Sequence, residues 1–345
     1  MRSFANLAMH LGFSLFAVDA TQLDDDCRSS NATHIVWKIS QTMATMPTFG
    51  RRRSQTTLTQ PKCVVQPRKQ AEQECLKYLQ DTIMPFDVPF FETLGFGSHD
   101  DDVDGLGNGI ATVSVKLALD AKAIYPWTDS LPKEIFYNYV LNYANLNEAR
   151  TNWRPLLIDA MNFTESPLWK SGNANLSSVV TWVNTHLWTQ LSRDGSSPIY
   201  FKSGQTPLIF DPMSVIAYGY ASCTGTSILF SNALRALGIP SRVAGTPAWY
   251  GNATQGNHNW VEVYDNGIWK FLEPSPALAH VDTLEADPCH RWFCNAERYP
   301  SSKVYAATLS KVVSSYFPLA WEWHCKDIPA VDRTQYYADI CSSCD

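Results

Sequence analysis

The sequence predicts an α+β protein in which one helix packs on an antiparallel sheet after a mostly helical region. Apolar residues recur at helical spacing in several segments between about 110 and 195. A further helical pattern begins at Cys223, and two strand-like runs follow it. Asp265-Asn266-Gly267 joins these runs, and Asn-Gly accepts the positive φ values of a tight hairpin turn. The two strands are therefore expected to pair antiparallel.

Proline residues separate the helical segments before residue 198. Within each segment, apolar residues lie three or four positions apart, which is the spacing of one helix face. The expected helices lie within 70–84 and 110–123, in segments opened by Pro132 and Pro155, and over 177–191. We therefore expect this part of the chain to be mostly helical.

The pattern of the sequence changes after residue 198. Apolar side chains at helical spacing follow Cys223, and Gly238 and Pro240 are placed to end that helix. Strands are expected over 242–245, 260–264 and 268–272. A helix followed by an antiparallel sheet supports the α+β class, and no internal repeat is visible.

Residues 1–20 are typical of a signal peptide. Arg2 gives a positive start, an apolar stretch follows, and Val18 and Ala20 stand at the small-residue positions before a cleavage point. The stretch is too short and too interrupted for a transmembrane helix, and no later segment has eighteen consecutive apolar residues. The mature protein is therefore expected to be secreted, or held in the lumen of the secretory pathway, with no membrane attachment.

Cysteines and glycosylation sequons agree with secretion. The nine cysteines are an odd number, so at least one thiol is left over unless it pairs between chains. If Cys223 is that thiol, the other eight can form up to four disulfides, whose pairing the sequence leaves open. Disulfides are favoured over zinc or redox sites for two close groupings, Cys289-His290 with Cys294 and Cys341 with Cys344. The N-x-S/T sequons begin at Asn31, Asn162, Asn175 and Asn252.

Charge and composition exclude some classes of partner. The chain is 45% apolar and 17% charged, as in globular proteins, and its net charge is -6. No basic stripe is present to neutralise phosphates, so no nucleic-acid partner is expected. The cluster at 51–53 is interpreted as a solvated turn or a processing site. The acidic pattern at 100–105 resembles the start of a calcium loop, but Ala111 at its twelfth position lacks a carboxylate. No metal or cofactor is predicted.

Cys223 is the candidate nucleophile. It stands at the expected start of a helix, where unpaired N–H groups and the helix dipole stabilise negative charge. A thiol in that position has a lowered pKa, so more of it is thiolate near neutral pH. The same N–H groups could bind the oxyanion of an acyl-transfer intermediate. Judged alone, a buried or disulfide-bonded cysteine is the commoner outcome.

His258 and Glu273 complete a candidate triad. His258 begins a strand, and histidine supplies both a general base and a general acid to a thiol nucleophile. Glu273 follows the next strand of the hairpin, where a carboxylate can hold the imidazole in one tautomer and orientation. Each residue alone is a weak signal, but their order along one helix and two paired strands is a much stronger one.

This arrangement resembles the transglutaminase-like superfamily, which shares its triad logic with papain-type enzymes. The stretches that carry the resemblance are ASCTG (221–225), RALGIPSRVAG (235–245), GNHNWVE (256–262) and WKFLEP (269–274). A wider similarity, from roughly 85 to 321, is to secreted bacterial transglutaminase-domain proteins that have a helical region before the core. Many members have Asp at the third triad position, and Glu273 is one methylene longer.

The resemblance implies a papain-like core with Cys223 as nucleophile, His258 as base and acid, and Glu273 as the orienting carboxylate. Together with the signal-peptide pattern, it divides the chain into segments. These are a signal peptide (1–20), an N-terminal extension (21–84), a helical region (85–197), a transglutaminase-like catalytic core (198–321) and a cysteine-containing C-terminal tail (322–345).

The expected function is thiol-dependent acyl transfer on amide bonds of peptides or proteins, through a thioester on Cys223. Hydrolysis, as in a protease or amidase, is favoured slightly over transfer to an amine, as in a cross-linking transglutaminase. The remaining alternative is a non-catalytic binding module that keeps the fold. The acyl acceptor, the oligomeric state and a propeptide role for the N-terminal extension are left open.

Three details of the site are also open. The candidate side-chain donors to an oxyanion are Gln190, Asn184 and Gln205. The aromatic residues that could line a cleft, or belong to the core, are Trp249, Tyr250, Trp260 and Trp269. A glycan on Asn252, in the loop before His258, would favour extended or small substrates.

Overall fold

The computed structural model describes residues 65–97, 109–276, 281–285, 287–289, 291–299 and 301–344. The chain divides into two compact units, Met1–Gln70 and Ala71–Asp345, and the second unit contains the sheet and the site discussed below. Several sequence predictions lie outside the described residues. They are the signal peptide, the cluster at 51–53, the acidic pattern at 100–105, Cys27, Cys63 and the sequon at Asn31.

The main sheet of the described residues has six strands in the order β5-β4-β3-β6-β8-β7. Every neighbouring pair runs antiparallel. Their bounds are β3 Ser241–Thr246, β4 His258–Asp265, β5 Ile268–Leu272, β6 Tyr305–Ala307, β7 Ser315–Tyr316 and β8 Pro329–Asp332. A separate parallel pair joins β1 (Tyr200–Phe201) to β2 (Tyr220–Ala221). The predicted hairpin is present, with φ of 51° at Asn266 and 89° at Gly267.

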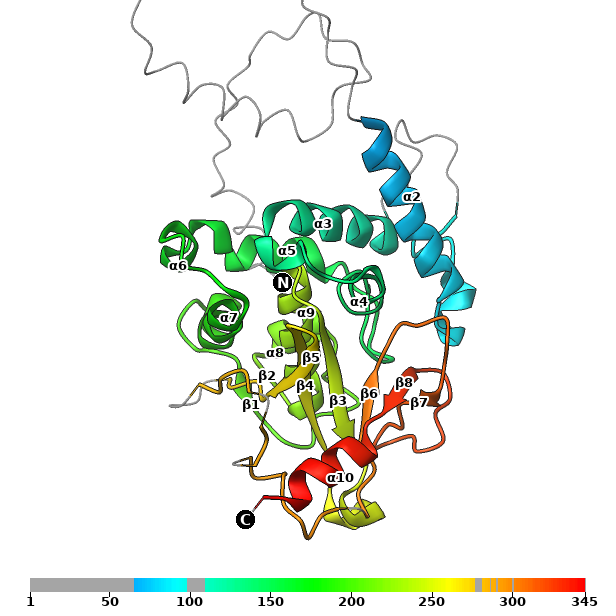
Figure 1. Ribbon diagram of the computed structural model, residues 1–345, viewed down its shortest axis with the longest axis vertical. Coiled ribbons are helices and arrows are strands. Elements are labelled where there is room, and N and C mark those ends of the chain that lie inside the picture. Colours follow the sequence, from blue (N-terminus) through cyan, green and yellow to red (C-terminus); the bar gives the residue numbers. More distant parts are fainter. Residues whose placement is uncertain are drawn as a thin grey trace, which may run out of the picture. The chain divides into compact units, whose positions relative to one another are not determined.

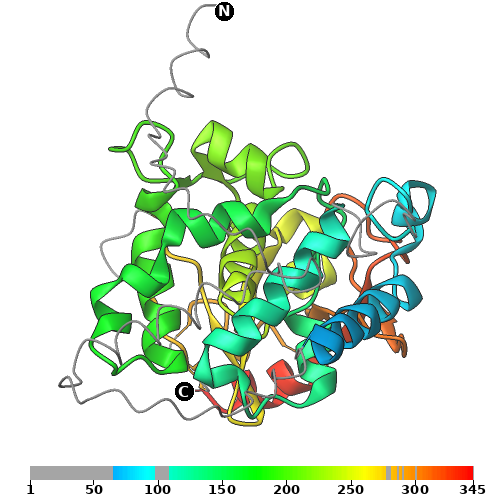
Figure 2. The ribbon, with the colours of Figure 1, turned by 90° about the horizontal axis from the view of Figure 1, so that it is seen from above.

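Helices precede the sheet along the chain. The α-helices are α2 Val65–Asp81, α3 Ile110–Ile124, α4 Lys133–Tyr139, α5 Trp153–Met161, α6 Pro167–Lys170, α7 Leu176–Gln190, α8 Pro212–Tyr218, α9 Cys223–Ala236 and α10 Thr334–Ser342. The 3-10 turns are η2 Pro85–Phe90, η3 Pro126–Thr128, η4 Phe163–Glu165, η5 Trp249–Gly251 and η6 Ala253–Gln255. In Figure 2 the helices from α3 to α7, coloured cyan to green, form a layer on the viewer's side of the strands. This confirms the predicted α+β class, with a helical region before an antiparallel sheet.

Helix α9 is the centre of the core. It packs against β3 and β4 on one side and against α5 and α7 on others, as Figure 1 shows. Every residue from Thr224 to Ala236 is therefore buried. Gly238 ends the helix with a φ of 73°, a left-handed conformation that glycine adopts without strain. The first residue of α9 is thus fixed against a rigid sheet.

Two buried arginines join the helical region to this core. Arg235 on α9 donates to the carbonyl oxygens of Ser241 and Ala144. Arg154 on α5 donates to the carbonyl oxygens of Arg235 and Val140. A buried charge needs such polar partners, because an unpaired one would be costly in the interior. The helical region is therefore bound to the core through specific polar contacts as well as apolar packing.

The segment 322–345, which we assigned to a C-terminal tail, supplies both a strand and a helix. Strand β8 lies between β6 and β7 in the sheet, and α10 lies across one end of the sheet, shown in red in Figure 1. The hydroxyl of Tyr337 on α10 donates to Glu262 Oε1 over 2.8 Å, and Trp260 Nε1 donates to that hydroxyl over 2.8 Å. Both partners lie on β4, so α10 is anchored to the strand that begins at His258.

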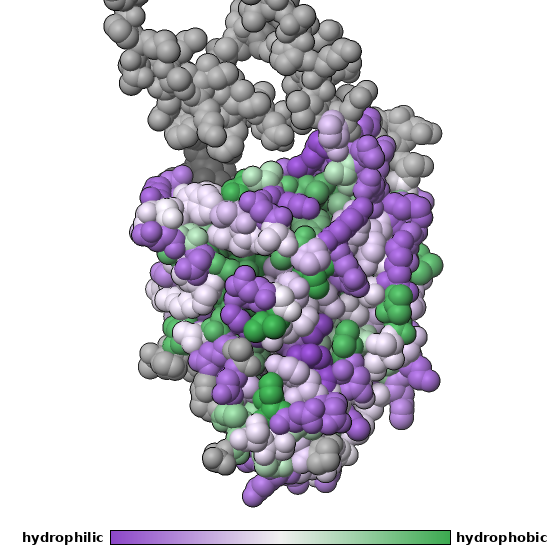
Figure 3. All heavy atoms as spheres, viewed as in Figure 1, coloured by the Kyte–Doolittle hydropathy of each residue, from purple (hydrophilic) through white to green (hydrophobic). Residues whose placement is uncertain are grey.

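The face of the molecule drawn in Figure 3 is mixed in character. Apolar side chains of the described residues are scattered among polar ones there and do not gather into one broad patch. None of the helices in the described segments combines the length and the apolar character that a bilayer span needs.

Candidate active site

The sequence around Cys223 places this thiol at the N-terminus of α9. Ser222 has an extended backbone, with φ of -74° and ψ of 178°, and the helix begins at the next residue. Gly225 in the first turn has no room for a side chain, because a Cβ there would lie 2.7 Å from the Cβ of Ala221. Glycine therefore lets the first turn of α9 pack closely on β2. This close packing holds Cys223, the first residue of α9, in position.

His258 and Glu273 meet on neighbouring strands. His258 is the first residue of β4, and Glu273 follows the last residue of β5. His258 Nε2 is hydrogen-bonded to Glu273 Oε1. Hydrogen bonding and charge from His258 act on the Cys223 thiol and lower its pKa, and because Glu273 takes up Nε2, Nδ1 is the ring nitrogen left for the sulfur. The structure thus brings all three predicted residues into one contiguous chain of contacts.

The electrostatics favour a thiolate–imidazolium pair. Burial raises the pKa of the Cys223 thiol, but hydrogen bonding and positive charge from His258 outweigh it, and the pKa lies below its ordinary value. The backbone N–H of Asn259 and the hydroxyl of Thr224 lower it further. Burial lowers the pKa of His258, yet Cys223 and Glu273 together raise it to about 9. Proton transfer from sulfur to imidazole is therefore favoured in the resting site.

A frame of hydrogen bonds fixes the backbone of Glu273. Its N–H donates to Asp282 Oδ2 over 2.7 Å, and its carbonyl oxygen accepts from Asn184 Nδ2 over 3.1 Å. Asn184 is fully buried on α7 and also accepts from the N–H of Ser275 over 2.9 Å. Asn184, one of our candidate oxyanion donors, therefore serves the carboxylate end of the site.

The other two candidate donors are also engaged elsewhere. Gln190 Nε2 donates to the carbonyl oxygen of Met161 over 3.4 Å, and Gln205 Nε2 donates to that of Ser203 over 3.0 Å. Neither side chain is among those that line the cleft at Cys223. The sequence indicated amides because they are good donors, but their spacing from Cys223 could not show what each amide would bind.

Trp292 is a contact that the sequence did not single out. Its Nε1 donates to Glu273 Oε1 over 3.2 Å, and its ring centroid lies 4.7 Å from that of His258. The Trp292 side chain is 52% exposed, so it covers the His258–Glu273 pair from the solvent side. Hydrogen bonding to Trp292, after the larger effect of His258, helps to hold the pKa of Glu273 below its ordinary value against the effect of burial.

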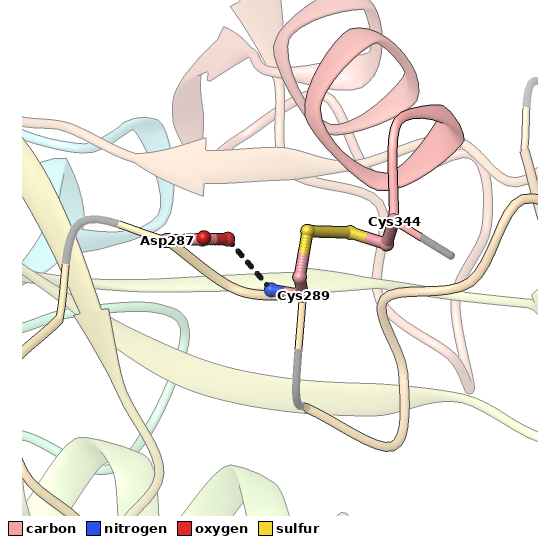
Figure 4. A group of neighbouring side chains, drawn as sticks. All are labelled: Asp287, Cys289 and Cys344. Atoms are coloured by element: carbon pink, nitrogen blue, oxygen red, sulfur yellow. Dashed lines mark hydrogen bonds between the residues drawn. A yellow bond between two sulfur atoms is a disulfide. The ribbon is translucent and has the colours of Figure 1, made fainter.

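Two disulfides hold the loop that carries Trp292. They join Cys289 to Cys344 and Cys294 to Cys341, which confirms that these spacings form disulfides. Asp287 lies beside the first of them and accepts from the N–H of Cys289 over 2.9 Å, as Figure 4 shows. Metal ligation needs free thiolates, and both sulfurs of this group are consumed by the bond.

An open cleft of about 950 Å³ runs over the three residues. Phe201, Trp292 and Trp321 are the large aromatic residues in its wall, whereas Trp249 and Trp260 lie in the core. Apart from Cys223 and His258, the charged side chains in the described wall are Glu273, Asp282 and Arg291, and each has an opposite charge as a partner. The cleft is lined by Phe201, Ser203, Gly204, Thr206, Ser222, Cys223, Thr226, Gly256, Asn257, His258, Asn259, Glu273, Pro274, Ser275, Pro276, Asp282, Arg291, Trp292, Ala320 and Trp321.

Part of the chain matches a known family model. Residues 167–274 match the family model described as the transglutaminase-like superfamily, and this segment contains all three residues. None of the curated proteins matches the chain. A candidate cysteine protease from Cytophaga hutchinsonii is a solved structure that aligns with it, at 14% identity and a TM-score of 0.29. The alignment covers 60% of this chain and 65% of that one, which is less than two thirds of that protein.

Proposed function

We propose that this chain, whose residues 167–274 match the transglutaminase-like superfamily, is a thiol-dependent enzyme that cleaves amide bonds of peptides or proteins. The observation that carries the proposal is the line of contacts from the Cys223 thiol through His258 to the Glu273 carboxylate. A nucleophile, a base and an orienting group in contact are what covalent acyl transfer requires.

The reaction follows from the charge state of the site. The Cys223 thiolate adds to the amide carbonyl carbon, and the carbonyl π electrons move to the oxygen, where the N–H of Cys223 can stabilise them. When the C=O bond re-forms, the C–N bond breaks and the leaving amine takes the proton held by His258. A thioester remains on Cys223. His258 then removes a proton from water, the hydroxide adds to the thioester, and the acid and the thiolate are released.

Water is the proposed acyl acceptor. A lysine side chain approaches as an ammonium ion, and a carboxylate without a partner would be needed to attract it. The carboxylates in the described cleft wall, Glu273 and Asp282, are already paired with His258 and Arg291. Nothing in that part of the wall therefore selects an amine over the abundant solvent.

Selective alkylation tests the nucleophile. Cys75 and Cys325 serve as controls within the chain, because both are free and buried, and burial raises the pKa of Cys75 to about 11 and also raises that of Cys325. Iodoacetamide near pH 6 should modify Cys223 first, and His258→Ala should slow that reaction. Peptide mapping by mass spectrometry reads out the modified residue. Equal labelling of the three thiols, or none, would favour a binding module that keeps the fold without the chemistry.

A second assay decides the acyl acceptor. A glutamine-containing protein and a labelled amine are incubated together with the enzyme, and new N-termini and amine incorporation are counted. Hydrolysis predicts new N-termini or released acid, and it predicts no excess of incorporated amine. Amine incorporation without cleavage would establish a cross-linking transglutaminase and end the hydrolase proposal.

We also propose that the protein acts in an oxidising, extracellular setting. Two disulfides support this location, as do the sequon residues Asn162, Asn175 and Asn252, whose side chains are all exposed. Mass spectrometry of the protein from its source should show a mature chain that starts after Ala20 and glycans on these asparagines. A chain that retains residues 1–20 and carries no glycan would contradict secretion.

A further inference from the structure

A pair of hydroxyl groups stands beside the candidate nucleophile. Ser222 is the N-cap of α9, and a serine there usually accepts a hydrogen bond from an amide in the first turn. The Ser222 side chain makes no such bond, and its hydroxyl is bonded to that of Thr206. Ser222 is only 5% exposed, yet both residues line the cleft next to Cys223.

The number of hydrogens shows what this pair can do. The two hydroxyls carry two hydrogens, and one of these is used in the bond between them. The structure gives neither hydroxyl a second partner within the described residues, so one hydrogen is left to donate. Thr226, one helical turn further on, differs because its hydroxyl already donates to the carbonyl oxygens of Ser222 and Cys223.

The backbone N–H groups at the start of α9 also have hydrogens left to donate. The first hydrogen bond within α9 runs from Thr226 N–H to the Ser222 carbonyl oxygen. The N–H groups of Cys223, Thr224 and Gly225 come before it, and the serine cap that would satisfy one of them points elsewhere. A hydroxyl hydrogen and the positive end of a helix therefore converge on the wall that carries the sulfur.

We propose that the Thr206–Ser222 hydroxyl pair is the side-chain donor of the oxyanion hole, acting with the N–H of Cys223. This proposal rests on the acyl-transfer function above. When the sulfur adds to the carbonyl carbon, the C–S bond forms and the π electron pair moves onto oxygen. The free hydroxyl hydrogen then bonds to that oxygen and stays on its own hydroxyl throughout. The charge disappears again when the C=O bond re-forms and the leaving group departs.

Two reagents separate this role from other effects on Cys223. p-Nitrophenyl acetate acetylates a thiolate through a tetrahedral oxyanion, and its leaving group needs no proton. Iodoacetamide alkylates the same thiolate at a saturated carbon, where no oxyanion forms. An oxyanion donor therefore affects the first rate and not the second, whereas a group that activates the sulfur affects both.

The experiment compares both rates in Thr206→Val, Ser222→Ala and wild type. Thr206→Val should slow acetylation of Cys223 about 100-fold, the usual effect of losing one such donor, and leave alkylation within about twofold. Ser222→Ala should also slow acetylation, because it removes one of the two hydroxyls and leaves the other without its anchor. Thr206→Ser should restore most of the rate. Thr185→Val, whose hydroxyl is bonded within α7, is the matched control.

The outcomes are distinguishable. If acetylation is unchanged in both Thr206→Val and Ser222→Ala, the pair is not the donor. If acetylation and alkylation slow in parallel, the pair only supports the start of α9, and the proposal is likewise overturned. If wild-type Cys223 is not alkylated selectively, the proposed function itself fails and the oxyanion role fails with it. Thermal melting of each variant shows that the fold is intact.

Discussion

Glu273→Gln is the sharpest test of the charge state of the site. The substitution keeps the shape of the side chain and a hydrogen-bond acceptor for His258, but it removes the negative charge. Burial lowers the pKa of His258, and Cys223 and Glu273 raise it to about 9. Without the carboxylate, one of these two partners is gone and the effect of burial remains. The pKa of His258 must therefore fall.

The expected loss of protonated His258 can be bracketed by comparing two values of its pKa. At pH 8 a histidine with a pKa of about 9 is about 90% protonated, whereas one with the ordinary pKa of about 6.5 is about 3% protonated. A return to the ordinary pKa would thus reduce the imidazolium fraction about 30-fold. Loss of Glu273 alone should give an intermediate reduction, about threefold to tenfold at pH 8.

The pH profile should narrow from the alkaline side. The alkaline limb reports His258, so it should move to lower pH when the pKa of His258 falls. The acid limb reports formation of the Cys223 thiolate beside an imidazolium that is still protonated at low pH, so it should not move to higher pH. The assay is the rate of Cys223 acetylation by p-nitrophenyl acetate from pH 5 to 10.

Glu165→Gln is a suitable control, because Glu165 pairs with Lys170 on the surface, outside the cleft wall. Its profile should match that of wild type. The reasoning would be refuted if the Glu273→Gln profile also superimposed on that of wild type, or if its alkaline limb stayed in place or moved to higher pH. Either result would mean that the thiolate–imidazolium pair does not depend on the carboxylate.

Two further substitutions test the surroundings of the triad. Trp292→Phe removes one hydrogen bond to Glu273 and keeps an aromatic ring, so the alkaline limb should shift the same way by less, with a rate loss of about fivefold. Glu262→Gln leaves Arg242 buried without its counter-ion and should lower the free energy of unfolding by about 3–5 kcal/mol in urea titrations at pH 7. Burial raises the pKa of Glu262, but Arg242 and Arg333 lower it below its ordinary value. Its contribution to stability is therefore present above the unfolded-state pKa of about 4.3 and lost as pH falls through the folded one, and the variant should lack this acid sensitivity.

Local rules of sequence predicted much of the fold. Residues 223–238 contain both the apolar residues at helical spacing that predict α9 and the glycine that ends it. Residues 265–267 alone predict the turn of the β4–β5 hairpin. These signals do not depend on the rest of the chain. The apolar run predicted this strand only over 260–264, because the first two residues of β4 are polar, whereas the interpretation of His258 as a strand start agrees with the structure. Pairing with β3, up to Thr246, extends the strand to His258.

The same local rules could not predict features that depend on contacts between distant parts of the sequence. Strands β6, β7 and β8 have three, two and four residues, which is too short to show an alternating pattern, and they exist because they pair with each other and with β3. Helix α8 could have been found, since Asp211 caps it and Pro212 occupies its first position. Trp292 gave no local signal, because its role depends on disulfides between cysteines that are 55 and 47 positions apart.

The triad residues were accessible because each lies at the end of a predictable element. The hydroxyl pair was not, since Thr206 lies sixteen residues before Ser222 in a stretch without regular structure. Amides were the natural candidates on chemical grounds. Which polar side chains line the cleft wall near the sulfur is decided by tertiary packing, which no local pattern encodes.

The proposed reaction needs a reduced sulfur at Cys223 and oxidised, disulfide-bonded sulfurs around Trp292. Cys223 is useful only as a thiolate, while the loop around Trp292 is held by two sulfur–sulfur bonds. A strong reductant would release that loop, and a strong oxidant would convert Cys223 to a sulfenic acid. Cys294 Sγ lies only 3.6 Å from Cys344 Sγ, so one released thiol has a neighbouring bond to attack. The rate of the proposed reaction should therefore be highest within a limited range of redox potential. The concentration of reductant in a preparation should then change the measured activity.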